Sequence, residues 1–237
     1  MPDNFSTSPA DGTHTFDDFH SNLSVAAGLI GNLDWEMVAI VAGSSTLTYI
    51  ASPNGILRLV TDGTTGRGAA LYLEPDAVTL GGGDGIVIRA RVRLVTTLTG
   101  NNIRIGLDDS VTATDGTVGI FFVSTAGLLS FDVASTNGNV TKAVTGISTL
   151  TSGTTMVLNT WHDIELRLSD TNANGGPETI QCYVDGEFGG EISAGAGDPS
   201  LLGSTETMEF KIAHWDTGAG ASQVFEIDYY EVYIPRV

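Results

Sequence analysis

The chain has 237 residues, of which 41% are hydrophobic, so a single large domain can bury a sizeable core. Acidic side chains outnumber basic ones 28 to 10, and the formal net charge of −18 disfavours binding to the phosphate backbone of nucleic acids. The 30 glycines, together with abundant Thr and Ser, favour strands and turns over helices. Length, composition and charge therefore indicate a mainly β protein that does not bind nucleic acid.

The N-terminal stretch of residues 1–14 is polar and contains Pro2, Pro9 and Gly12, which predicts a short arm ahead of the domain. It has neither a basic region nor an apolar region, so we expect no secretory signal. The most apolar segment, VAIVAGSS after Met37, is too short to span a bilayer, and we expect no membrane partner.

Short runs of alternating apolar residues follow one another between turn signals along the rest of the chain. They lie at 55–60, 69–74, 85–95, 102–107, 118–123, 128–133, 162–169, 179–186, 207–215 and 225–234. About ten strands without an amphipathic helix predict an antiparallel sandwich or barrel, formed as one domain over residues 15–237. Residues 134–160, rich in Thr, Ser and Gly, are expected to form a surface hairpin or an interaction loop.

An arginine row stands out in so acidic a chain. Arg89, Arg91 and Arg93 alternate with apolar residues and therefore share one face of a strand. A second alternating run supplies the candidate partners Asp163, Glu165 and Arg167. We predict a cross-strand ion ladder, and the alternative is a row that docks an anion or a partner.

Three segments resemble those of the concanavalin A-like lectin/glucanase superfamily, which includes laminin G-like and laminarinase-like jelly rolls. Residues 159–166 (NTWHDIEL) are similar to its "W-H-x-hydrophobic" strand entry, 180–186 (IQCYVDG) to its "Y-V-D-G" hairpin, and 227–233 (IDYYEVY) to its final strand. Residues 16–19 (FDDF) and 55–59 (GILRL) suit its first strands, so the resemblance spans about 16–237. It implies an all-β fold, an antiparallel β-sandwich jelly roll, but little about chemistry.

The last strand carries Glu226, Asp228 and Glu231, an E-x-D-x-x-E string that invites comparison with retaining glycosidases. In the laminarinase-like enzymes this string lies on a strand in the middle of the chain, where a bulge brings all three carboxylates to the concave face. Here Glu226 and Asp228 share a face by alternation, whereas Glu231 falls on the other face unless a bulge intervenes. The mid-chain runs VGIFFV and LLSFDV have no comparable acid pair, so we assign no catalytic residue and expect no enzyme.

Other residue types that often carry chemistry give weak signals. The histidines, at 14, 20, 162 and 214, have no metal-binding spacing, and no serine nucleophile motif occurs. Trp161 and Trp215 are expected in core or rim packing, with sugar stacking as the alternative, and Cys182 is expected to be a buried, inert thiol.

Residues 170–175 (DTNANG) reproduce the opening of a calcium-binding loop. The twelfth position of such a loop requires a carboxylate, and here it is Gln181. Glu178 is the alternative ligand, and an ordinary hairpin loop is the simpler interpretation of the segment 170–178. We therefore assign no metal and no cofactor.

Two functions remain open. The first is a non-catalytic structural or decoration protein on a virus (phage) particle, assembled in the host cytoplasm, which associates with itself and with capsid proteins. The second is a carbohydrate-binding module in which Tyr229, Tyr230, Tyr233 and Trp215 offer stacking surfaces. A laminarinase-like hydrolase is the third alternative.

Overall fold

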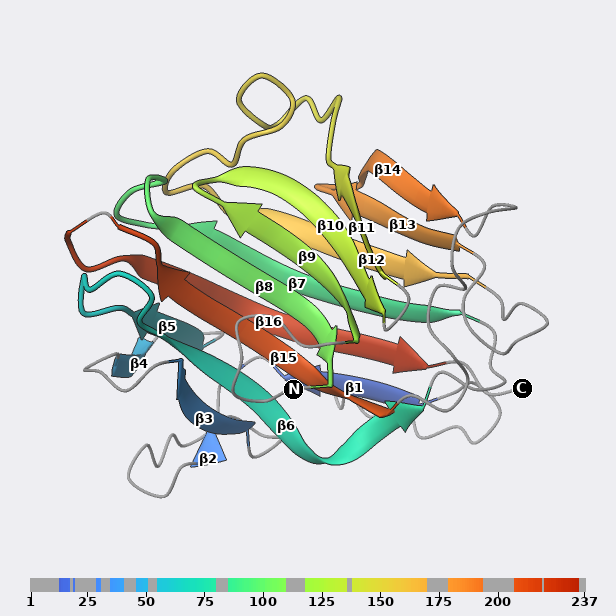
Figure 1. The fold of residues 1–237 in the computed structure, drawn as a ribbon, viewed down its shortest axis with the longest axis horizontal. Helices are drawn as coiled ribbons and strands as arrows, with labels where there is room; N and C mark the ends of the chain where they lie inside the picture. Colours follow the sequence, from blue (N-terminus) through green and yellow to red (C-terminus); the bar gives the residue numbers. More distant parts are fainter. Residues whose placement is uncertain are drawn as a thin grey trace.

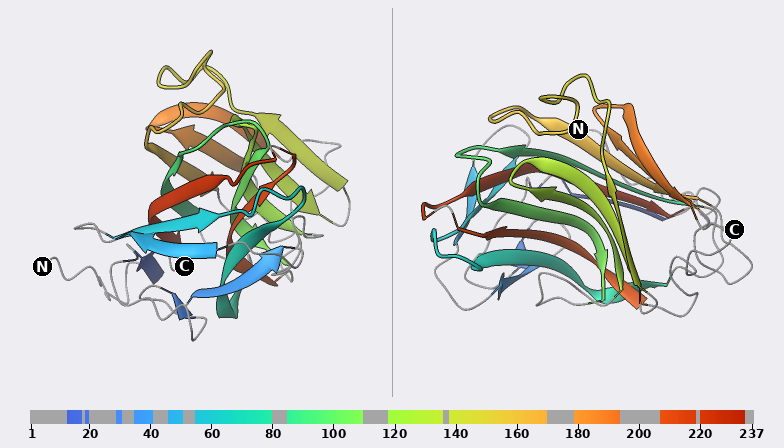
Figure 2. Two further views of the ribbon diagram at one scale, coloured as in Figure 1. Left: turned by 90° about the vertical axis from the view of Figure 1, so that its left-hand side faces the viewer. Right: turned by 45° about the horizontal axis from the view of Figure 1, so that its top comes forward.

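The computed structural model has two antiparallel β-sheets stacked face to face, and its described part contains no helix (Figure 1). The structure describes residues 13–17, 19, 29–30, 35–40, 46–50, 55–79, 85–109, 118–135, 138–169, 179–193, 207–218 and 220–234. Each sheet has eight strands, and the two layers are seen most clearly edge-on in Figure 2. Among these residues, no helix long and apolar enough to span a bilayer is found.

Sheet A contains β16, the strand at the C-terminal end of the chain, between β7 and β5. The order is β14 (Glu187–Ser193), β13 (Thr179–Val184), β12 (His162–Leu168), β7 (Ile86–Leu94), β16 (Val224–Ile234), β5 (Ile56–Val60) and β4 (Thr46–Ile50). The eighth strand, β1 (Thr13–Asp17), pairs with the second half of β16, while β5 pairs with the first half. Two short strands thus share one edge of β16.

Sheet B has the order β11 (Gly138–Ala143), β10 (Leu128–Ser135), β9 (Gly119–Thr125), β8 (Asn101–Asp108), β15 (Thr207–Asp216), β6 (Gly68–Thr79), β3 (Trp35–Ile40) and β2 (Leu29–Ile30). Strands from both ends of the chain lie within each sheet, as in a jelly roll. The fold is therefore the predicted all-β antiparallel sandwich.

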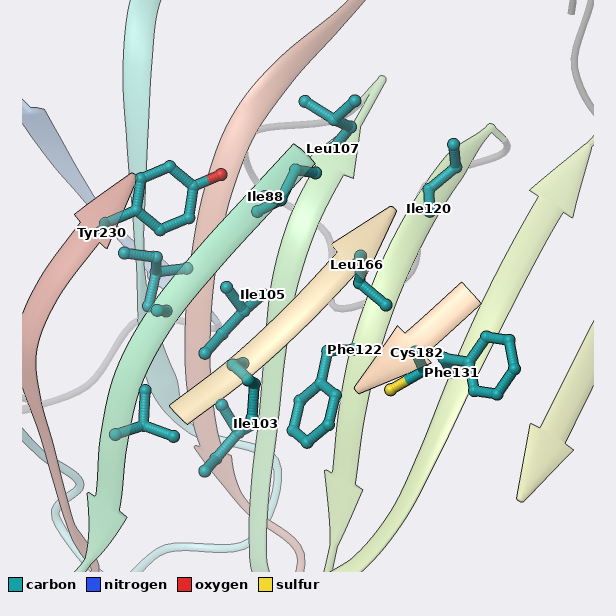
Figure 3. Close-up of a cluster of buried hydrophobic side chains, with 14 of the residues drawn as sticks. Ile88, Ile103, Ile105, Leu107, Ile120, Phe122, Phe131, Leu166, Cys182 and Tyr230 are labelled. Atoms are coloured by element: carbon teal, nitrogen blue, oxygen red, sulfur yellow. The ribbon is translucent and has the colours of Figure 1, made fainter. Parts of the chain in front are cut away.

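The core lies between the two sheets and follows from the period of two in each strand. In β7 buried and half-buried residues alternate without a break, so Ile88, Ala90 and Val92 point inward while the arginines point outward. Figure 3 shows side chains from both sheets meeting in this layer, among them Phe122 from sheet B and Leu166 from sheet A. Burial of this continuous apolar cluster is the main source of stability.

All ten strands expected from the sequence are present, as β5 to β10, β12, β13, β15 and β16. The pattern missed six strands, β1 to β4, β11 and β14, which lie at or near sheet edges and are mostly short. β1 begins at Thr13, two residues inside the stretch assigned to the arm, and residues 1–12 lie outside the described residues.

The stretch 134–160 contains a hairpin and a folded loop. Its first part completes β10 and forms β11, and its second part buries Val144, Ile147 and Met156 against the core. The hairpin is confirmed, and the loop packs against the sandwich instead of extending away from it.

Cys182 is fully buried on β13, as predicted. Burial raises the pKa of its thiol to about 12, so the reactive thiolate is almost absent at neutral pH.

His214 is fully buried on the core side of β15. Its Nε2 atom lies 2.9 Å from Oδ1 of Asn101, and its ring packs 5.6 Å from the ring of Phe225. Burial lowers the pKa of His214 from 6.5 to about 3, despite the nearby Asp216 carboxylate. The imidazole is therefore a neutral core group at neutral pH.

We expect this histidine to make the protein less stable as the pH falls below about 6.5. The unfolded chain then takes up a proton that the folded chain refuses, which costs about 1.4 kcal/mol of unfolding free energy per pH unit. Urea unfolding of the wild type and of His214→Asn between pH 7 and 5 measures the effect, and the slope should be smaller in the variant. A His214 imidazole that titrates near pH 6.5 in the folded protein, followed by NMR, would contradict this interpretation.

Candidate functional site

The outer face of sheet A carries an unusual density of charge. Five strands contribute residues to it, and we call the residues named in the next sentence the charged face. Its ionised residues are Arg58 of β5, Glu226, Asp228 and Glu231 of β16, Arg89, Arg91 and Arg93 of β7, and Asp163, Glu165 and Arg167 of β12; β13 adds the phenol of Tyr183. Five arginines balance five carboxylates, so these ten residues together are formally neutral in a chain whose net charge is −18.

A β-bulge in β16 brings the three carboxylates to the same face. The pairing with β7 shifts between Ile227, opposite Val92, and Tyr229, opposite Arg91, so that one residue of β16 is extra. Beyond the bulge Tyr230 points into the core and Glu231 points outward. Strict alternation would have placed Glu231 on the opposite face, and the bulge is the reason that it lies on the same face as Glu226 and Asp228.

The sequence contained a signal for this bulge that the alternation argument did not use. Ile227 and Val232 are both core residues, but they are five positions apart. Strict alternation sends residues an odd number apart to opposite faces, so both can be buried only if the strand is bulged.

Glu226 is the most enclosed carboxylate of the charged face, with no exposed side-chain surface. One carboxylate oxygen accepts hydrogen bonds from Nε and Nη2 of Arg58, and the other accepts from Nε of Arg93 at 2.5 Å. The ring of Trp161 lies 4.6 Å from the guanidinium carbon of Arg93 and covers it. Trp161 is thus in rim packing, as expected.

The predicted partners of the arginine row face it in register. Asp163 stands opposite Arg91, and Glu165 stands opposite Arg89, with 2.5 Å between Oε2 of Glu165 and Nε of Arg89. Glu165 also binds Arg167 on its own strand. The cross-strand ion ladder is therefore confirmed.

Two further contacts tie the ladder to β16. Arg91 Nη1 lies 3.3 Å from Oδ2 of Asp228, and Arg89 Nη1 lies 3.4 Å from Oε2 of Glu231. The hydrogen bonds to Glu165 are the main reason that the pKa of Arg89 is raised.

A pocket of about 320 Å³ opens on the charged face where β7, β12, β13 and β16 lie side by side. It is lined by Arg89, Asp163, Ile164, Glu165, Arg167, Tyr183, Gly186, Tyr229 and Glu231. The hydroxyl of Tyr229 donates to Oδ1 of Asp163 at 3.1 Å, and burial followed by the Asp163 charge raises its pKa. The guanidinium of Arg167 lies over the ring of Tyr183 at 4.2 Å. The pocket thus combines fixed hydrogen-bonding groups with two phenol rings.

A hydrogen bond between His162 and Asp185 joins the W-H segment to the Y-V-D-G segment. His162 Nδ1 donates to Oδ2 of Asp185 at 2.8 Å, while its Nε2 accepts from the backbone N–H of Val157. Asp185 also accepts from the backbone N–H of Asp163 and from the hydroxyl of Thr149. Burial alone raises the pKa of Asp185, but these hydrogen bonds outweigh it and hold the pKa below its ordinary value. These hydrogen bonds therefore hold the W-H segment and the Y-V-D-G segment together at the rim of the pocket.

The outer face of sheet B carries a buried ion pair and two small apolar clusters. Lys211 and Asp108 form an ion pair of 2.6 Å in which both side chains are 1% exposed. The mid-chain strand β9 points Phe121 and Val123 to this face, and Trp215 packs there on a small apolar cluster of β3, β6 and β15. Phe121 and Val123 thus make the outer side of β9 apolar along its middle.

The remaining candidate site residues differ in burial, and some of them lie outside the described part of the chain. Tyr230 is fully buried between Trp35 and Phe210, so its expected role as a sugar-stacking surface is wrong. Tyr233 shares the charged side of β16 with Tyr229. The calcium-loop candidate 170–178 and His20 lie outside the described residues, as do the side-chain surroundings of His14. In the described part of the chain, no group of three or more potential ligands is placed to hold a metal ion.

Comparisons with solved structures match nearly the whole chain. An endo-1,3-β-glucanase from Streptomyces sioyaensis has 12% sequence identity and a TM-score of 0.63, over 92% of this chain and 94% of that one. A cellulose-induced protein, Cip1, has 15% identity and a TM-score of 0.55 over 92% and 96%. The binding domain of botulinum neurotoxin serotype C1 has 10% identity and a TM-score of 0.58, over 93% of this chain and 48% of that one.

No protein-family model and no curated protein sequence matches the chain. At these identities the likeness shows the fold alone, an antiparallel jelly-roll sandwich that the chain shares with these structures. None of the structures named above is a virion protein, so the phage role stays a prediction.

We predict that Glu226→Gln destabilises the protein by about 3 kcal/mol, because it removes one partner from a buried charge cluster and leaves two arginines uncompensated. Asp163→Asn is the matched control: its carboxylate is 54% exposed and lies 3.9 Å from Arg91, so the expected cost is below about 1 kcal/mol. Denaturant unfolding of both variants measures the difference. Equal costs would show that the enclosed position of Glu226 has no special role.

Proposed function

We propose that the protein is a non-catalytic carbohydrate-binding jelly roll and that the pocket on the charged face is its binding site. The pocket itself is the observation that carries this proposal. Its volume of about 320 Å³ falls at the lower end of the roughly 300–1,000 Å³ that is usual for ligand sites. Known carbohydrate-active proteins with the same fold, such as the Streptomyces glucanase, support the ligand class.

The lining of the pocket suits a sugar for chemical reasons. Carboxylates, guanidinium groups and phenol hydroxyls offer acceptors and donors that are already oriented by the ion ladder, so little ordering entropy is lost on binding. The rings of Tyr183 and Tyr229 add apolar surface beside these polar groups. A sugar ring, with hydroxyls at its edge and C–H groups on its faces, matches this combination.

Charge narrows the ligand class further. The lining holds two arginines and three carboxylates, a formal charge of −1, within a chain of net charge −18. Anionic sugars such as uronates are repelled by the net negative charge of this lining, and neutral sugars are not. We therefore propose a neutral glycan.

The three acids of β16, Glu226, Asp228 and Glu231, are held by arginines in a way that disfavours catalysis. A catalytic acid or base must come within roughly 2.6–3.2 Å of the atom it protonates or deprotonates. Both oxygens of Glu226 are engaged by arginines and its side chain is not exposed, while Asp228 and Glu231 each lie against one arginine. Glu226 is thereby closed to a substrate, and at Asp228 and Glu231 a substrate would have to compete with an arginine for the carboxylate oxygens.

We expect Tyr183→Ala to weaken binding of a neutral β-glucan by about tenfold or more, because it removes a ring and a hydroxyl from the pocket wall. Trp215→Ala, on the outer face of sheet B, is the control and should bind as the wild type does. Calorimetric titration with laminarin, barley β-glucan and soluble cellulose derivatives measures the affinities.

The opposite pattern, with binding lost in the Trp215 variant and kept in the Tyr183 variant, would move the site to sheet B. Release of reducing ends from any of these glucans by the wild type, abolished by Glu226→Gln or Glu231→Gln, would overturn the non-catalytic assignment.

A structural role on a virus particle is the second candidate, and the ion ladder favours it. The ladder links β5, β16, β7 and β12 into one network without any disulfide, which suits a rigid building block made in a reducing cytoplasm. Self-association through the edges of the sandwich would then complete a surface lattice or spike.

This candidate predicts a stable homo-oligomer at nanomolar concentration and genes for capsid and portal proteins beside its own. Mass photometry and the gene neighbourhood test the two parts. A monomer encoded among genes of polysaccharide metabolism would contradict the particle role and leave the glycan-binding proposal standing.

A further inference from the structure

Phe188 is a large apolar side chain without an explanation in the fold. It lies on β14 and is 53% exposed; among the described residues Leu128 is the other large apolar side chain with so much exposed surface. It pairs with Tyr183 in register, and the two rings meet edge to face with centroids 5.6 Å apart. Phe188 therefore stands on the charged face, directly beside one wall of the pocket.

The pairing registers place Phe188 at the end of a row that crosses the sheet. Glu231 of β16 is opposite Arg89 of β7, which is opposite Glu165 of β12, which is opposite Tyr183 of β13, which is opposite Phe188. Neighbouring strands are about 4.8 Å apart, so the four steps from β16 to β14 cover about 19 Å. This distance exceeds the size of one sugar ring and accommodates several linked rings.

The residues of this row change from charged to aromatic on going from β16 to β14. Its β16 end is polar, with carboxylates and guanidinium groups, and its β14 end is aromatic. Arg167 covers one side of the Tyr183 ring, which fixes that ring and leaves Phe188 as the outer platform. A polar pocket continued by an exposed aromatic ring is a surface for a chain that extends beyond the pocket.

We infer that the site binds several consecutive sugars of a neutral polysaccharide chain, which runs across β12, β13 and β14 and stacks one sugar ring on Phe188. This inference rests on the proposed function and specifies its ligand as a polymer instead of a single sugar. The sugar on Phe188 lies outside the pocket, so it adds affinity only when the chain is long enough to reach both places.

Titration with laminari-, cello- and N-acetylchito-oligosaccharides of two to six units tests this. For the series that binds, wild-type affinity should rise by about threefold to tenfold at the length that reaches Phe188, as expected for one aromatic stacking contact. Phe188→Ala should lose this rise and keep the wild-type affinity for the shortest ligand that binds.

Leu128→Ala is the matched control, because Leu128 is also 53% exposed but lies on sheet B. It should keep the full dependence on length. Phe188 is exposed, so its truncation is not expected to impair folding, and thermal unfolding of both variants verifies this.

The possible outcomes distinguish failure of the polymer inference from failure of the proposed function. Affinity that does not change with length in the wild type, or a rise that persists in Phe188→Ala, overturns the polymer assignment while glycan binding stands. An altered oligomeric state of Phe188→Ala with unchanged length dependence would identify Phe188 as a protein contact. Failure of all three series to bind at any length contradicts both proposals.

Discussion

The charge compensation on β16 is the constraint on which the rest of sheet A depends. This strand lies inside the sheet and presents three carboxylates on one face, and β12, two strands away, carries further acids. Like charges this close on a sheet repel each other, and removal of Glu226 from water adds a desolvation penalty. The arginines of β7, inserted between the two acidic strands, make the arrangement possible. Five of the eight arginines of the chain are used in this way.

The same compensation explains why an acid string typical of glycosidases is compatible with a structural role. A bulge aligns the carboxylates, which is the feature that such enzymes also need, but here each aligned carboxylate meets a guanidinium group. The geometry of the string and the availability of its oxygens are separate properties. The sequence motif reports the first, whereas the residues of the neighbouring strand decide the second.

Particular elements show what the sequence could and could not predict. The long strands β7 and β12 were predictable because each has a strict period of two, and the ion ladder between them followed from that period. Short edge strands such as β2 and β4 carry too few residues for a pattern to emerge. The bulge required attention to the odd spacing of Ile227 and Val232. Tyr230 was grouped with Tyr229 and Tyr233 as a stacking surface, which was wrong because beyond the bulge Tyr230 points into the core.

The pocket lay beyond sequence reasoning for a different reason. Its walls come from β7, β12, β13 and β16, and the sequence separation between Arg89 and Glu231 is 142 positions. Local pattern predicts which face of a strand a residue occupies, but the neighbours of that strand are set by the order of strands in the sheet. Tyr183 was visible as part of the Y-V-D-G hairpin, yet its role as a pocket wall depends on Glu165 standing opposite.

Net charge and local charge act at different ranges, and together they define what can approach the charged face. At physiological ionic strength charges are screened beyond about 8 Å, so the acidic remainder of the surface acts mainly on ligands that come close to it. The charged face itself is neutral and its charges are paired, so it attracts neither cations nor anions strongly. A neutral ligand with many hydroxyls gains from the oriented dipoles of such a surface without disturbing its pairs. Complete pairing of the charges, which argues against catalysis, is thus also what makes the face suitable for an uncharged polar polymer.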